Sequence, residues 1–224
     1  MKIIRWAKLQ FKASMFTRHA QLSFIAFLII LPDLFVLAAE GDQNSRWCHG
    51  EDNATAEQRL NGCTAVIKQN NNRDNVAYAY NARGSQYYYN GLHTRAIKDY
   101  DHAIRLKPDY AQAVNNRCWV RAVVGHLNDA LKDCDKAVEL QPNVGNSFEN
   151  RAFVYLRLGQ LKKAIADYNR ALKLDPESAD DLYGRGLARL KSGDKEGGQA
   201  DIAAAKTKKP WIVDEFIRYG IRAP

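Results

Sequence analysis

Signatures of the common catalytic sites are missing from this 224-residue sequence. It has no glycine-rich nucleotide-binding loop, no HExxH zinc motif and no serine nucleophile elbow. Without these signatures, the sequence offers no group of residues arranged for chemistry. We therefore expect a protein that is not an enzyme and that needs no cofactor, no bound metal and no small-molecule substrate.

A strong excess of one charge is also missing from most of the chain. The formal net charge is +8, but residues 1–39 contain five basic residues and one acidic residue. The remainder has 28 basic and 24 acidic residues, a balance of +4. This surplus is too small to indicate binding to a phosphate backbone, so no nucleic-acid partner is predicted.

The long apolar run of the chain is LSFIAFLIILPDLFVLAA, at residues 22–39. It follows a basic lead and ends in small residues, which is typical of a secretory signal. We predict a signal peptide over residues 1–39, cleaved after Ala38 or Ala39, and an exported protein that is periplasmic or secreted. An uncleaved membrane anchor is the alternative, although Pro32 and Asp33 interrupt the run before the roughly 20 residues that span a bilayer. The lead is long for a signal, so Met15 is a second candidate start.

Proline is scarce, but its spacing is regular. Four of the six prolines recur every 34 residues, at Pro108, Pro142, Pro176 and Pro210. A glycine stands 17 residues before each of them, at Gly91, Gly125, Gly159 and Gly193. Glycine readily adopts the left-handed conformation that ends a helix, and proline stops the helix that follows. Each period therefore predicts two antiparallel helices joined by a tight turn.

Small and bulky residues recur with the same period. One position holds Ala103, Ala137, Ala171 and Ala205. A small position holds Gly84, Cys118, Ala152 and Gly186, and a bulky position holds Tyr100, Cys134, Tyr168 and Ile202. Bulky residues beside small ones allow neighbouring helices to interlock closely.

Proline-terminated runs such as AIKDYDHAIRLKP (96–108) and AIADYNRALKLDP (164–176) closely resemble the tetratricopeptide repeat family. The resemblance covers four units, at residues 77–110, 111–144, 145–178 and 179–212. It implies an all-α fold, an α-solenoid of antiparallel helix hairpins that winds into a right-handed superhelix. The fourth unit departs from the pattern, because Gln199, Lys206 and Lys208 stand where the first unit has aliphatic residues. This suits a terminal unit, whose outer face meets water.

Two flanking segments are predicted to cap the solenoid. Residues 40–76 are expected to form an N-terminal capping hairpin, in which Thr55 and Gln58 make a capping box. Residues 213–224 are expected to form a C-terminal capping helix that covers the last hairpin. The apolar face of that closing helix is made by Trp211, Ile212, Phe216 and Tyr219. Signal, caps and units account for the whole chain, which leaves no room for a catalytic domain.

Each unit also has an arginine on its first helix and an aspartate on its second. The arginines are Arg83, Arg117, Arg151 and Arg185, and the aspartates are Asp99, Asp133, Asp167 and Asp201. In an antiparallel hairpin these positions face each other, which predicts a ladder of ion pairs within the fold. Binding of an anionic ligand by the arginines is the alternative, and it is weaker because each arginine has a carboxylate in the same unit.

Four cysteines in an exported chain can pair in three ways. Their spacing favours Cys48 with Cys63 and Cys118 with Cys134. The second pair takes the small and the bulky position of one unit, so it would join the two helices of a hairpin. A metal site with Cys48, His49 and Cys63 is the alternative, but adjacent Cys and His do not have the usual spacing of zinc ligands.

Resemblance to the family implies that the first helices line a concave groove where another protein or peptide binds. The implied groove residues are Tyr78, Asn81, Ser85, Tyr88, Asn115, Asn116, Trp119, Glu149, Asn150, Phe153, Asp180, Tyr183 and Leu187. Amides suit an extended peptide backbone, and large aromatic residues are typical of binding hot spots. We expect a protein-binding adaptor or scaffold of the bacterial cell envelope. The alternative function is a module that binds an envelope glycan or another polymer. For Trp119 and Phe153 the alternative is a structural role, in which they pack between units.

Overall fold

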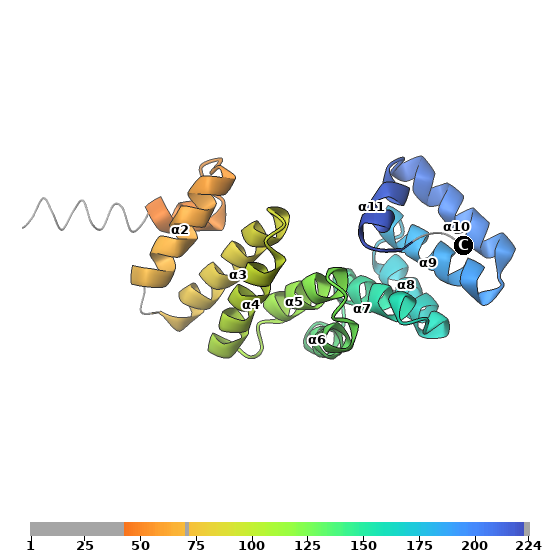
Figure 1. Cartoon of the computed structure of the whole chain (residues 1–224), viewed down its shortest axis with the longest axis horizontal. Coiled ribbons are helices and arrows are strands. Elements are labelled where there is room, and N and C mark those ends of the chain that lie inside the picture. Colours follow the sequence, from red (N-terminus) through yellow and green to blue (C-terminus); the bar gives the residue numbers. More distant parts are fainter. Residues whose placement is uncertain (1–42, 70–71, 222–224) are drawn as a thin grey trace, which may run out of the picture.

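The computed structural model describes residues 43–69 and 72–221, and the predicted signal peptide lies outside these residues. The described chain is mostly helical and contains no strand. Its helices form antiparallel pairs that follow one another along a curved solenoid (Figure 1). No helix in this part of the chain combines the length and the apolar character that a membrane span requires.

Four helix hairpins make up the body of the solenoid. They are α3 (Arg73–Tyr89) with α4 (His93–Leu106), α5 (Ala111–Val123) with α6 (Leu127–Leu140), α7 (Gly145–Arg157) with α8 (Leu161–Leu174), and α9 (Ala179–Ser192) with α10 (Lys195–Lys208). The second helix of each pair ends just before one of the regularly spaced prolines. The four hairpins therefore follow the 34-residue period of the sequence.

The turn inside each hairpin depends on its glycine. Gly91, Gly125, Gly159 and Gly193 have φ angles of 72°, 90°, 72° and 96°. An L-residue with a side chain rarely adopts this left-handed conformation, so glycine is needed there. The first helix consequently stops one or two residues before this glycine in every unit.

A short helix over residues 43–49 and helix α2 (Ala56–Gln69) precede the first hairpin. The predicted capping box is present, because the Gln58 amide N–H donates to Thr55 Oγ1 (3.2 Å) and Thr55 N–H donates to Gln58 Oε1 (2.8 Å). Helix α3 begins at Arg73, before the predicted start of the first unit. The reason is local, since the Asn72 side chain caps α3 by accepting from the amides of Asp74 and Asn75.

Both favoured cysteine pairs are disulfides in the structure. Cys48–Cys63 joins the helix at 43–49 to α2, and Cys118–Cys134 joins α5 to α6. The Cα atoms are 4.5 Å apart in the first pair and 5.3 Å apart in the second. All four side chains are at most 1% exposed, so the bridges belong to the core.

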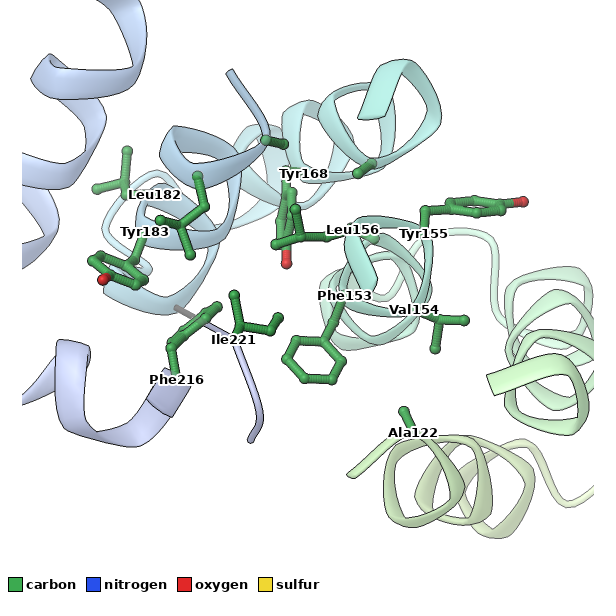
Figure 2. Packing of buried hydrophobic residues seen from close by; sticks show 14 of the residues in the cluster. Ala122, Phe153, Val154, Tyr155, Leu156, Tyr168, Leu182, Tyr183, Phe216 and Ile221 are labelled. Atoms are coloured by element: carbon green, nitrogen blue, oxygen red, sulfur yellow. The ribbon is translucent and has the colours of Figure 1, made fainter. Parts of the chain in front are cut away.

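Small and bulky residues interlock between helices as their columns predict. A Cβ added at Gly84 would lie 2.8 Å from a ring carbon of Tyr100, and one added at Gly186 would lie 2.8 Å from Ile202. The ring of Tyr168 lies against Gly184 of the next unit. Figure 2 shows part of the largest core cluster, in which Tyr168 and Leu156 pack beside α9.

The predicted ladder of arginine and aspartate is also present. Each arginine makes two hydrogen bonds, 2.6–3.0 Å long, to the aspartate of its own hairpin. The third guanidinium nitrogen reaches the preceding repeat, as in Arg117 to Asp101 (2.6 Å) and Arg151 to Asp135 (3.1 Å). Because their nitrogens are committed to these bonds, the arginines hold the units together rather than forming an anion site.

Candidate functional site on the concave face

Helix α11 (Ile212–Arg218) and Tyr219, the residue after it, contact the first helices of three units. We predicted that it covers the last hairpin, and it does contact α9 and α10. Its aromatic residues reach further, because Phe216 lies 4.8 Å from Tyr183 of α9 and 6.2 Å from Phe153 of α7, measured between ring centroids. In Figure 2 the rings of Phe216, Phe153 and Tyr183 converge beside Ile221. Part of the surface made by the first helices is therefore filled by the chain itself.

Tyr219 extends these contacts to the first half of the solenoid. Its ring centroid is 5.0 Å from that of Trp119 on α5 and 6.1 Å from that of Phe153. Trp119 in turn donates its indole N–H to the Tyr88 hydroxyl of α3, at 2.7 Å. Burial raises the pKa of the Tyr219 phenol well above its ordinary value. A continuous row of aromatic rings results, from α9 to α3.

An open pocket of about 280 Å³ lies at the α3 end of this row. Its lining comes from α3, α4, α5 and the C-terminal segment: Ser85, Tyr88, Tyr89, Tyr100, Asn116, Trp119, Val120 and Tyr219. Tyr89 is 78% exposed and stands at the rim, while Tyr100 is buried below with its hydroxyl 3.3 Å from Ser85 Oγ. The pocket combines aromatic walls with hydroxyl and amide groups.

Asparagine side chains pair between neighbouring first helices. Asn116 Nδ2 donates to Asn81 Oδ1, and Asn150 Nδ2 donates to Asn115 Oδ1, both at 3.0 Å. Asn81 also donates to the Tyr110 hydroxyl and is only 4% exposed. These amides therefore brace the concave face, and Asn116 is the one that lines the open pocket.

An acidic corner lies beneath α11 at the junction of α7 and α9. Burial, with smaller contributions from Asp181 and Asp180, raises the pKa of Glu149 to about 8. Burial likewise raises the pKa of Asp181 to about 7, against the lowering effect of its hydrogen bond with Ser178. Lys209 partly offsets this negative charge, since its Nζ lies 3.2 Å from Asp180 Oδ2. The acidic corner is thus tuned to titrate near neutral pH.

The structure distributes the predicted groove residues over different environments. Ser85, Tyr88, Asn116 and Trp119 line the open pocket. Glu149, Phe153 and Asp180 line a narrow space beneath α11, and Tyr183 lies against Phe216. The remaining positions lie elsewhere. Tyr78 stacks on His49, and Leu187 is fully buried. The amide pairs include Asn81, Asn115 and Asn150.

Four lining residues of the pocket were not among the predicted ones, namely Tyr89, Tyr100, Val120 and Tyr219. The sequence did single out Tyr100 and Tyr219, although not as pocket residues. Tyr100 occupies the bulky position of the first unit, and Tyr219 belongs to the apolar face of the closing segment. The sequence does not show that these two residues meet.

Three family models match parts of the chain. One described as a TPR repeat matches residues 154–193, and two described as tetratricopeptide repeat match residues 134–166 and 77–110. No curated protein sequence matches this chain.

Several solved structures share the fold. MamA from Desulfovibrio magneticus RS-1 is 17% identical with a TM-score of 0.65, over 76% of this chain and 96% of that one. YrrB, described as a TPR protein with an unusual peptide-binding site, is 19% identical with a TM-score of 0.57, over 74% and 82%. The first TPR of Spaghetti, bound to an HSP90 peptide, is 23% identical with a TM-score of 0.50, over 54% and 93%. The matched stretches, residues 77–110 and 134–193, are similar to tetratricopeptide repeats, and the solved structures share the helical-solenoid fold of this chain.

Proposed function

We propose that this chain is a non-catalytic scaffold that binds a peptide segment of another protein in the open pocket of its concave face. The observation that carries the proposal is the pocket itself, at about 280 Å³ between α3, α5 and Tyr219. It has room for a few side chains of a bound segment, and its rim offers exposed aromatic surface. Tetratricopeptide repeats, and peptide-binding proteins of the same fold, support a protein-binding scaffold in general.

The chemistry of the lining fits a peptide. Tyr89 and Trp119 supply large, rigid apolar surfaces, which contribute most to affinity at protein interfaces. Asn116 can both donate to and accept from a backbone amide. The extended groove that we propose includes further first-helix positions: Tyr78, Ser85, Tyr88, Asn115, Glu149, Asn150, Phe153, Asp180 and Tyr183. Asn81 and Leu187 are buried and would support this groove from beneath.

We place this function outside the cytosol, in the bacterial cell envelope. Two disulfide bridges suggest an oxidising, exported environment, since cytosolic thiols are normally kept reduced. The basic lead and apolar run at the start of the sequence favour the same location. The second candidate function is binding of an envelope glycan, which aromatic faces with nearby hydroxyl and amide groups would also suit.

Selection from a random peptide library, alongside a glycan array, tests the proposal. We expect the chain to select peptides, and Tyr89→Ala to weaken the best of them about tenfold, which is a typical loss at a hot spot. Tyr80→Ala is the matched control, because Tyr80 lies on the same helix but stacks on His102 outside the pocket. Binding to glycans alone would favour the second function, and equal loss in both variants would remove the pocket from the proposal.

A further inference from the structure

We propose that α11 is an internal ligand of the groove, which gives way to a partner helix presenting two aromatic residues three positions apart. This inference rests on the proposed function and names the chemistry of the partner. Phe216 and Tyr219 are the aromatic pair in this chain, and they contact residues from three different units. The partner would replace them on the same surface.

Helix α11 is amphipathic and is held against the solenoid by its inner side. Its inner side is buried, with Ile212, Phe216 and Ile221 at 0%, 4% and 6% exposure. Its outer side leaves Trp211 and Ile217 at 58% and 45% exposure. A seven-residue helix is not stable alone in water, so α11 keeps its shape only while its inner side chains are docked.

Departure of α11 leaves the charged groups beneath it largely compensated. Lys209, just before α11, bonds both Asp180 (3.2 Å) and Glu215 of α11 (2.5 Å). When α11 leaves, Lys209 stays at the end of α10 and can keep its bond to Asp180. The aromatic residues have no such substitute, because Trp119, Phe153 and Tyr183 would lose their contacts with Phe216 and Tyr219. The vacated surface therefore selects an incoming segment with aromatic residues in the same places.

Tyr219 connects this exchange to the open pocket. It is part of the lining of the open pocket and also of the narrow space beneath α11. A ligand that enters the pocket from the α3 side therefore meets the side chain that helps to hold α11 in place. Binding in the pocket and release of α11 are coupled through this one residue.

Competition with a synthetic peptide tests the inference on the full chain. The probe is a labelled peptide with the sequence of residues 209–221, and the variant is Phe216→Ala with Tyr219→Ala. We expect the variant to bind the peptide about tenfold more tightly than the parent chain, because its own α11 no longer competes. Trp211→Ala with Ile217→Ala is the control on the exposed side of α11, and it should bind the peptide like the parent. Equal affinity in the parent and the Phe216/Tyr219 variant would overturn the inference.

Hydrogen exchange on the parent chain gives an independent result if the variant folds poorly. The chain is isotope-labelled, so that its α11 can be told from the peptide, and the peptide is added in excess. We expect faster exchange in α11 and unchanged exchange in α6 and α8. A peptide from the library that binds without changing exchange in α11 defeats this inference alone, whereas failure to select any peptide defeats the proposed function.

Discussion

Burial changes the acidity of two carboxyl groups beside α11. The pKa of Glu149 is raised to about 8 and that of Asp181 to about 7, in each case chiefly because burial disfavours the charged form. Asp180 and Asp175 add negative charge around both groups, while Lys209 acts in the opposite direction on Glu149. The folded chain therefore holds protons here that the unfolded chain releases.

Stability should consequently fall as pH rises from about 5 to about 8. A raised folded-state pKa favours the folded state below that pKa, and the contribution is lost as pH passes through it. We expect Glu149→Gln to stabilise the chain on the order of 1 kcal/mol at pH 8 and to have little effect at pH 5. Urea denaturation at both pH values measures this, with Glu139→Gln on the exposed side of α6 as control. A stability that rises over this range in the parent but not in the variant would contradict the assignment.

The arginine ladder gives a prediction that distinguishes two of its steps. Asp133 receives a second arginine, since Arg121 also bonds it at 2.7 Å, whereas Asp167 receives only Arg151 among the described residues. Breaking a buried pair leaves an uncompensated charge and costs about 3 kcal/mol. We expect Arg151→Leu to lower the free energy of unfolding by this whole amount and Arg117→Leu to lower it by less. Chemical denaturation of both variants measures the difference. If the two variants lost equal stability, Arg121 would have no compensating role.

At the scale of helices, the bulky residue of the second helix is accommodated differently from unit to unit. A tyrosine there needs a glycine beside it: Tyr100 uses Gly84 of its own unit, and Tyr168 uses Gly184 of the next. The second hairpin has the Cys118–Cys134 disulfide instead. A tyrosine at 134 could not use the next unit as Tyr168 does, because the position equivalent to Gly184 is Asn150. It would therefore need a glycine at position 118 of its own unit.

Replacement of this disulfide should therefore depend on which residues replace it. Cys118→Ala with Cys134→Ala is expected to lower stability by about 3 kcal/mol, as loss of a bridge closing a loop of this length does. Cys118→Gly with Cys134→Tyr reproduces the first unit and should recover part of that loss. Cys118→Ala with Cys134→Tyr has no neighbouring glycine and should recover none. Thermal melts under oxidising conditions compare the three variants with the parent chain, and equal melting temperatures for the two tyrosine variants would refute the packing rule.

Across the whole molecule, the last hairpin should open before the interior ones. Helix α10 buries only Gly198, Asp201 and Ala205, whereas α8 also buries Tyr168 and Leu172. Stability in a solenoid is a sum over units and their neighbours, so a unit with little apolar contact opens first. We expect amide exchange in α10 to be faster than in α6 and α8. Equal protection in α8 and α10 would contradict the expectation.

Much of the architecture could be predicted from the sequence, because it depends on short-range rules repeated four times. Gly91 and Pro108 define a hairpin by their own backbone preferences, and Arg83 and Asp99 face each other wherever that hairpin forms. The location of α11 depends on contacts between residues far apart in the chain, such as Tyr219 with Trp119. No local preference specifies such a contact, so the open pocket and its occupied neighbour appear only in the structure.

The amide pairs show the same limit on a smaller scale. Asn81 and Asn116 were predicted to face a ligand, because each was considered within its own unit. They also bond each other, since each first helix lies directly beside the next. Comparison of neighbouring units, rather than equivalent positions, is the way to find such pairs in a sequence.

The third nitrogen of each ladder arginine has a consequence for how this molecule can change over evolutionary time. Arg117, Arg151 and Arg185 bond Asp101, Asp135 and Asn169 of the unit before them, so three successive joints are built from the same two positions. A duplicated unit of 34 residues would bring both partners of this bond: the arginine that reaches the unit before it and the Asp or Asn that accepts from the unit after it. The array could therefore gain or lose whole units by recombination without having to evolve a new interface.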